Sequence, residues 1–515
     1  MRLKQRQLDD LLFRFESREH LQDLRDEITA LESRLRNDTS RNESKDSVPD
    51  WKAVQATLPP NSAFVEFVRY DNFAAALHGP RSYGAVLILP DGDPRWIPLG
   101  TEEELRTWLG VMKERLDYRA YVLSSRRSVA PPALRLRSAL HRIHDRFWGP
   151  IAKQLPPGTE TLGISPDGSL NFVSFAVLLD EQEQFLADTF RQIVYLSSGR
   201  DLLVNATRPA LREGPWAVVA VPDFEARRSE DDPGSASALD RAVLETIDSF
   251  PSVPGAREEL KRLHRIIPPE ARGVELMNAS EQDLRNLTTS PVVLHLTTHA
   301  FFLPAVQDGG PSGVQDFDQQ PDRLYRSGLV LTEAKRALAE RVGGAQVPFD
   351  QDGVLFSDEA TTLPLHNTRL VTLSSCESGL GEAVSGEGVL GLRRGFTLAG
   401  TTNILISLWP VSDNSTPKFM ESMYRLSLAT DRVGQSLWET QRRAFEEVDP
   451  RDDAELEEAI LRYGCFVLCQ RGPLQSAVPM PVLKKSFEPW WLAALAVTGA
   501  FLFLITRPIT MRNAK

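Results

Sequence analysis

The chain has 515 residues, more than one ordinary hydrophobic core accommodates, so we expect two or three domains. Hydrophobic residues make up 42% and charged residues 25%, as in soluble globular proteins, and the net charge of −11 argues against a general nucleic-acid binder. Three cysteines are too few for a disulfide framework, and the charged N-terminus does not resemble a secretory signal, so we expect the bulk of the protein in the cytosol.

The first segment, residues 1–48, is predicted to be a helix followed by a polar linker. Apolar residues recur at heptad-like spacing within residues 3–36, at Leu21, Leu24, Ile28, Leu31 and Leu35. A helix packed on its own domain and an oligomerising coiled coil both fit this spacing, because so few heptads are marginal for an independent coiled coil. The polar residues 36–47 are then predicted to form the linker.

From Trp51 onward, short apolar runs alternate with helical patterns, which predicts an α/β fold. The expected strands are residues 63–68, 84–89, 162–164 and 216–221, and the expected helices are residues 105–116 and 134–148. Residues 224–240 and 304–322 lack periodicity, and loops of this length are usually functional or disordered. The second of them follows His299, so we expect it to lie beside any site built there.

Two strand-like runs lead to residues that could form a nucleophile and its base. Val292–Leu296 is predicted to be a strand that ends at His299, and a second apolar run from Leu370 leads to Cys376 and a glycine-rich turn. Reactive groups gather at the carboxyl ends of parallel strands, so adjacent strands would hold His299 and Cys376 within reach of each other. The imidazole would take the thiol proton and later protonate the leaving amine.

Each of these residues alone is a weak signal, because a lone cysteine or histidine at a strand end is more often structural. His295 lies four residues before His299 on the same strand face, and we interpret it as structural. Cys465 and Cys469 lie in an apolar run and are expected to be buried strand residues. The sequence has no C-x-x-C pair, and we expect neither a metal nor a cofactor.

Several segments, in order along the chain, resemble the CHAT family of caspase-like domains, which are related to separases. They are T-L-G-I-S-P-D-G-S-L-N-F-V-S-F-A-V-L (161–178), V-P-G-A-R-E-E-L (253–260), L-H-L-T-T-H-A (294–300), S-G-L-V-L-T (327–332), D-G-V-L-F-S-D-E (352–359), L-S-S-C-E-S-G-L-G (373–381) and the run 386–413. The resemblance covers residues 50–470 and implies a caspase-like three-layer αβα fold with a mainly parallel sheet. It further implies a degenerate pseudo-protease half over residues 50–210 and an active half over residues 215–472.

The resemblance implies that His299 is the general base and Cys376 the nucleophile, with the backbone N–H groups of Ala300 and Cys376 as the oxyanion hole. The family usually has glycine where this chain has Ala300, and alanine keeps the N–H but restricts φ. Separases hold a basic substrate side chain with a carboxylate, for which Asp413 and Glu387 are the candidates here. A solvated loop or capping role is the alternative for Asp413.

Residues 489–507 are predicted to form a transmembrane helix, after a linker over residues 473–488 and before a tail over residues 508–515. Its uncharged core, Trp490–Ile505, approaches the roughly 17–25 residues that span a bilayer. Lysine and arginine flank it on both sides, so the charges do not settle its orientation. A buried core helix is the alternative. We expect a single-pass C-terminal anchor with the catalytic domain in the cytoplasm.

These features predict a membrane-tethered, caspase-like cysteine endopeptidase that cleaves a protein substrate and is regulated by a partner or by proximity. The alternative is a catalytically idle scaffold that recruits partners to a membrane, and Ala300 would favour this alternative. A third option is an esterase or transferase that uses the same catalytic dyad, Cys376 and His299. Expected partners are the protein substrate and the membrane, with a second copy or an activating protein as further candidates, and no nucleic acid. A role in bacterial defence or programmed cell death would fit relatives of the family.

Overall fold

A computed structural model describes residues 50–72, 79–125, 130–204, 214–223, 238–303, 327–345, 347–348, 351–377 and 387–474. The predicted N-terminal helix and linker, over residues 1–48, lie outside these ranges, as do the loop over residues 304–322 and the predicted anchor over residues 489–507. Within the described ranges, every helix is too short or too polar to span a bilayer.

Residues 51–195 contribute the first group of helices and strands. They are α3 (Trp51–Ala56), β1 (Ser62–Asp71), β2 (Arg81–Ile88), β3 (Arg95–Thr101), α4 (Glu102–Ser125), α5 (Leu136–Ile143), α6 (Gly149–Ala152), β4 (Thr161–Ser165), α7 (Leu186–Thr189) and β5 (Gln192–Tyr195). The strands and helices expected here from the sequence are confirmed. The sequence did not predict β3, an exposed strand at the end of the sheet, where Pro98 is tolerated and few apolar residues are needed.

Residues 216–470 contribute the second group. They are β6 (Trp216–Ala220), α8 (Ala238–Asp248), α9 (Gly255–Ile266), β7 (Arg272–Met277), α10 (Glu281–Arg285), β8 (Val293–Phe302), β9 (Ser327–Val330), α11 (Ala334–Val342), β10 (Val354–Phe356), α12 (Ser357–Ala360), β11 (Leu370–Glu377), α13 (Glu387–Leu398), β12 (Asn403–Ser407), α14 (Thr416–Thr430), α15 (Val433–Phe445), α16 (Asp453–Ala459) and β13 (Phe466–Gln470).

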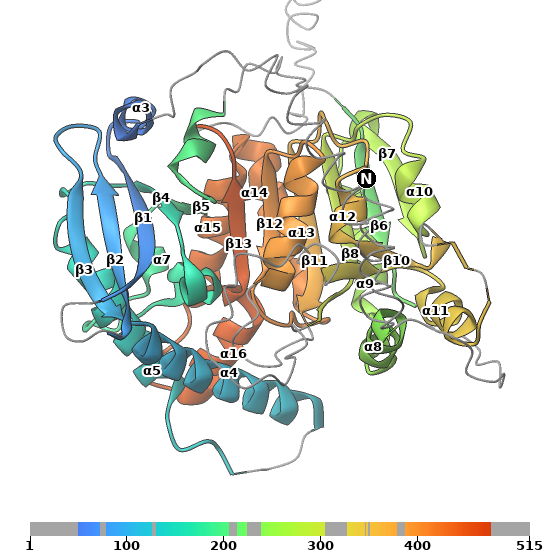
Figure 1. Cartoon of the computed structure of the whole chain (residues 1–515), viewed down its shortest axis with the longest axis horizontal. Coiled ribbons are helices and arrows are strands. Elements are labelled where there is room, and N and C mark those ends of the chain that lie inside the picture. The colour runs from blue at the N-terminus through green and yellow to red at the C-terminus, as the bar shows by residue number, and fades with distance from the viewer. Residues whose placement is uncertain are drawn as a thin grey trace, which may run out of the picture. The chain divides into compact units, whose positions relative to one another are not determined.

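One large sheet runs through both groups, with helices on its two faces (Figure 1). The strand order is β10-β9-β8-β11-β12-β13-β5-β4-β1-β2-β3, and β6 pairs with β8 and β7 beside this path. The pairs β6–β8, β8–β11 and β11–β12 are parallel, whereas the outer pairs β1–β2, β2–β3 and β9–β10 are antiparallel. The expected α/β fold with a mainly parallel sheet is confirmed.

The inner strands are apolar because both of their faces are covered. Every residue of β4, β6, β12 and β13 is buried, which is the pattern of strands that have helices above and below them. Cys469 is one of these buried strand residues, as expected. Cys465 is also buried but lies one residue before β13, because the chain there is still leaving the π-helical turn Ile460–Gly464.

The two predicted halves share this one sheet. They meet where β13 pairs in parallel with β5, at Cys469 and Tyr195. A buried ion pair between Arg115 of α4 and Glu457 of α16 adds a second link, because the two charges neutralise each other away from water. Residues on both sides of the join therefore belong to one compact unit.

Candidate active site

The two predicted catalytic residues lie opposite each other on adjacent strands. Strands β8 and β11 pair in parallel, with a register that runs from Leu370 opposite Val293 to Cys376 opposite His299. Paired residues of a parallel ladder direct their side chains to the same face of the sheet. The backbone therefore brings the predicted nucleophile and base together, as the sequence indicated. The side chain of Cys376 lies outside the described residues.

The imidazole of His299 contacts two residues of the segment that precedes α9, Phe250 and Pro251. Its Nε2 lies 2.8 Å from the carbonyl oxygen of Pro251, and the ring of Phe250 packs against it with 4.6 Å between the ring centroids. A carbonyl oxygen can only accept, so Nε2 carries a proton, and Nδ1 is then the basic nitrogen of the neutral ring. Sequence reasoning missed Pro251 because a backbone carbonyl leaves no signature in the residue pattern.

Burial sets the charge state of His299. Its side chain is 4% exposed, and burial lowers the pKa of the imidazole below its ordinary 6.5. The hydrogen bond to the Pro251 carbonyl raises the pKa, and the positive charge of Lys335 lowers it. The net lowering means that the imidazole is neutral at neutral pH and able to accept a proton.

The strand that carries His299 does not end there, contrary to the sequence prediction. Strand β8 continues to Phe302 because β9 returns antiparallel and pairs with its last residues, Ala300 opposite Leu329. Ala300 is buried in this extended backbone. Among the described residues, the non-glycine positions with positive φ are Asn61, Glu183, Asn278, Glu333 and Asp431, so alanine carries no strain at position 300. The assignment of Ala300 and Cys376 to an oxyanion hole stays a prediction.

His295 occupies a fully bonded position deep in the same face of the sheet. Its side chain is 0% exposed, with Nδ1 at 3.1 Å from the Tyr424 hydroxyl and Nε2 at 2.8 Å from Glu259 Oε1. Burial raises the pKa of the Tyr424 hydroxyl, which is therefore neutral. With both ring nitrogens engaged, His295 has the contacts of the structural residue that the sequence indicated.

Of the two predicted substrate-binding acids, Asp413 caps a helix. Its Oδ1 accepts the N–H of Gly255, the first residue of α9, at 2.8 Å. Burial raises the pKa of this carboxyl, and the Gly255 N–H lowers it. This geometry is that of the capping alternative, because a carboxylate stabilises a helix N-terminus. The side chain of Glu387 lies outside the described residues, and a substrate-binding role of either acid stays a prediction.

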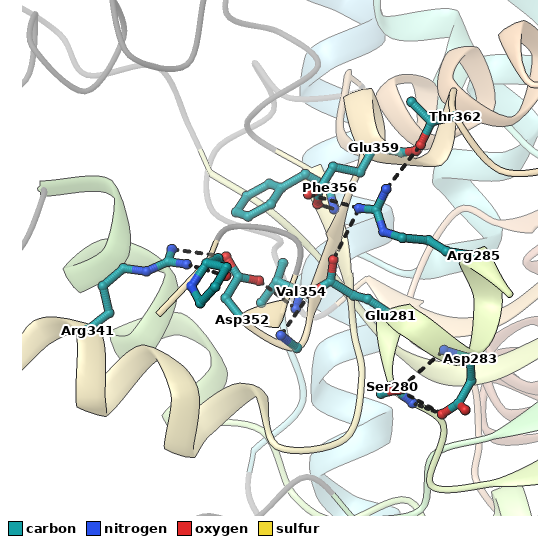
Figure 2. A network of polar contacts seen from close by, with 12 residues as sticks. Ser280, Glu281, Asp283, Arg285, Arg341, Asp352, Val354, Phe356, Glu359 and Thr362 are labelled. Carbon is teal, nitrogen blue, oxygen red and sulfur yellow. Dashed lines mark hydrogen bonds and ion pairs between the residues drawn. The ribbon is translucent and has the colours of Figure 1, made fainter. Parts of the chain in front are cut away.

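A network of carboxylates and arginines lies at the edge of the sheet that β10 forms beside β9 (Figure 2). Strand β10 is the last strand of the described path on that side. Side chains accept the N–H groups at its two ends: Gly353, the residue before β10, donates to Glu281 at 3.0 Å, and Phe356, the last residue of β10, donates to Glu359 at 3.0 Å. Because an open strand edge invites pairing with another chain, these bonds protect β10.

Arginines balance the charge of this network. Arg285 lies between Glu281 and Glu359, at 3.4 and 3.2 Å, and Arg341 contacts Asp352 at 3.0 Å (Figure 2). Burial, together with the charges of Asp352 and Glu359, raises the pKa of Glu281 to about 9. The raised pKa favours the protonated form of Glu281, and the hydrogen bonds of Glu281 and Glu359 hold the strands that extend β8 beyond His299.

Comparison with known proteins shows the domain family of this chain. A family model described as the CHAT domain matches residues 137–499, more than half of the chain. Among solved structures, the separase of Saccharomyces cerevisiae in its complex with securin is similar with a TM-score of 0.36 and 11% sequence identity. That similarity covers 82% of this chain and 30% of the separase chain, so the chain spans less than a third of its length. No curated protein matches. The chain belongs to the CHAT domain family.

Proposed function

We propose that the chain is a caspase-like cysteine endopeptidase that cleaves a protein substrate with Cys376 and His299. The observation that carries the proposal is the register of β8 and β11, which sets Cys376 directly opposite His299 in a CHAT domain. The Pro251 carbonyl supports it, because it fixes the tautomer in which His299 Nδ1 is the basic nitrogen.

The reaction follows from these roles. His299 accepts the thiol proton of Cys376, and the thiolate attacks the carbonyl carbon of the scissile peptide bond. The N–H groups of Cys376 and Ala300 are the proposed donors to the oxyanion that forms. His299 then protonates the leaving amine, and water hydrolyses the thioester. The bond from Nε2–H to the Pro251 carbonyl stabilises the imidazolium between these two steps.

The experiment compares cleavage of a peptide library by the full chain and by single variants. Cys376→Ala should abolish thiol-dependent cleavage, and His299→Ala should lower kcat by about a thousandfold or more, because paired groups act as one unit. Cys469→Ala is the matched control, since it removes a buried thiol in β13, which β12 separates from β11. His295→Gln should be far milder than His299→Ala, because the amide can keep one of the bonds of the ring.

The outcomes separate the proposal from its alternative. Cleavage that survives Cys376→Ala would mean that the mechanism is wrong. A chain that cleaves no peptide under any condition, with its fold intact, would support the idle scaffold that recruits partners.

The proposal includes a membrane tether, for which residues 489–507 are the candidate. The uncharged core Trp490–Ile505 and its flanking cations support it. Tethering would concentrate the enzyme on a surface, and a substrate or an activating partner on the same membrane would meet it at a raised effective concentration.

A further inference from the structure

The carboxylate of Glu259 bridges the two strands that carry the dyad. Glu259 lies on α9 and is 1% exposed. Its Oε1 lies 2.8 Å from Nε2 of His295 on β8, and its Oε2 accepts the hydroxyl hydrogen of Ser374 on β11 at 3.2 Å. One side chain thus ties both strands to each other and to the helix above them.

These contacts lie directly below the dyad on the same face of the sheet. His295 lies four residues before His299 on β8, and Ser374 lies two residues before Cys376 on β11. Even spacings along a strand keep side chains on one face of the sheet. The hydroxyl of Tyr424 forms a second bridge one step lower, at 3.1 Å from His295 Nδ1 and 2.7 Å from Thr372 Oγ1. Two successive side-chain bridges therefore support the register that sets Cys376 opposite His299.

The same helix also fixes the carbonyl that orients His299. The segment from Pro251 to the start of α9 is tied at two points: the N–H of Val253 donates to the Pro222 carbonyl at 2.9 Å, and the N–H of Gly255 donates to Asp413 at 2.8 Å. A displacement of α9 would therefore move the Pro251 carbonyl and turn the imidazole of His299. Glu259 therefore contacts the strand of His299 and lies on the helix whose start is tied to the Pro251 segment.

Stability alone is a poor reason for a carboxylate at this position. Replacing buried ion pairs with apolar side chains of similar volume is often neutral or stabilising, because desolvation costs so much. The neighbouring Glu258 shows the ordinary arrangement, since it is 45% exposed and pairs with Arg262 on the helix surface. The burial of Glu259 between two strands is explained by the geometry that its two oxygens impose.

We propose that Glu259 is a positioning residue of the dyad, holding β8, β11 and the Pro251 carbonyl in the arrangement in which His299 activates Cys376. This inference rests on the proposed function, because it assigns to Glu259 the alignment of the same two residues. The expected signature is a change in the reactivity of Cys376 rather than only a change in stability.

The experiment measures the alkylation rate of Cys376 in the full chain by iodoacetamide from about pH 5 to about pH 9, with peptide mass spectrometry to distinguish it from the other thiols. The variants are Glu259→Gln, which keeps the shape but loses the charge, and Ser374→Ala, which removes only the contact to β11. Glu258→Gln is the matched control on the same helix. Thermal unfolding of each variant reports its stability, and kcat and KM are compared wherever cleavage is detected.

In the wild type and in Glu258→Gln, iodoacetamide should alkylate Cys376 faster near neutral pH than an ordinary thiol, because the neutral His299 accepts the thiol proton as the sulfur reacts. In Glu259→Gln this alkylation should be about tenfold slower, because a displaced imidazole no longer reaches the thiol, and Ser374→Ala should slow it by less. Where cleavage is measured, kcat should fall while KM stays unchanged.

The outcomes distinguish this inference from the function on which it rests. A wild-type Cys376 that reacts no faster than an ordinary thiol would count against the dyad itself. A perturbed wild-type thiol that Glu259→Gln and Ser374→Ala leave unchanged would overturn the positioning role alone. Loss of the fold in both variants would also overturn the positioning role, because Glu259 would then contribute to the stability of the sheet alone.

Discussion

His299 shows how a residue predicted from a strand end acquires its chemistry from tertiary contacts. The patterns L-H-L-T-T-H-A and L-S-S-C-E-S-G-L-G predict that a histidine and a cysteine lie on two neighbouring strands. The register of β8 and β11 agrees with this prediction. The pattern cannot indicate Pro251, Phe250 or Glu259, because none of them is near His299 in sequence. A carbonyl, an aromatic ring and a buried carboxylate reach the site only when α9 packs on the sheet.

The lowered pKa of His299 has a consequence for the pH dependence of catalysis. Burial favours the neutral ring, so the proton-accepting form persists on acidification to below 6.5, the ordinary value. We expect the acidic limb of the kcat/KM profile to lie below that pH and to disappear from the residual activity of His299→Ala. An acidic limb at or above 6.5 would contradict the described burial of the ring.

Glu281 predicts a pH dependence of stability. Its pKa is 4.5 in the unfolded chain and about 9 in the fold, so the stabilising contribution of its proton is complete below 4.5 and is lost as the pH rises toward 9. In Glu281→Gln this loss cannot occur, and the Tm should decline less than in the wild type between about pH 5 and about pH 9. Thermal melts across this range, with the exposed Glu103→Gln as control, measure the difference. Parallel Tm curves for wild type and Glu281→Gln would show that the carboxyl is ionised in the fold.

At the scale of elements, the start of α9 depends on close packing between distant segments. A Cβ at Gly255 would overlap the backbone oxygen of Asp413 and its carboxylate, which accepts the N–H of Gly255 at the start of this helix. Gly255→Ala should therefore lower the free energy of unfolding by about 1–3 kcal/mol, as other overpacking substitutions do.

Gly110 provides the matched control for that substitution. It lies exposed in α4, and a Cβ there would meet nothing within 4 Å. Gly110→Ala should stabilise the chain by up to about 1 kcal/mol, because alanine has the higher helix propensity. Urea denaturation measures both variants, and a neutral result for Gly255→Ala would mean that α9 tolerates displacement from Asp413.

The strands that the sequence predicted and those that it missed differ in how they are covered. Residues 162–164 and 216–221 are recognisable because β4 and β6 are apolar throughout. Strand β3 and the last residues of β8 were missed, since their pairing depends on β2 and β9 rather than on their own composition. Strand β5 was also missed, although all four of its residues are buried, because so short a run carries little pattern. Tertiary pairing decides where an outer strand forms or ends.

At the scale of the whole molecule, the proposed tether can be tested apart from catalysis. We expect the full chain to fractionate with membranes and to resist extraction by high salt, since apolar insertion is insensitive to ionic strength. Truncation after Pro481 should release a soluble, folded fragment, because it leaves every described residue in place. A matched chain with lysines in place of Leu495 and Leu502 should behave as the truncation does. Quantitative recovery of the intact chain in the soluble fraction without detergent would remove the anchor from the proposal.

The position of β13 also determines when the sheet can be completed during synthesis. This strand lies between β12 and β5 although it is the last strand of the described chain. The ribosome makes the strands of the dyad and the whole first group of elements before residues 466–470. Until β13 forms, β12 and β5 each have one unpaired edge in the middle of the future sheet. The sheet therefore becomes continuous across the two predicted halves only after residues 466–470 have left the ribosome.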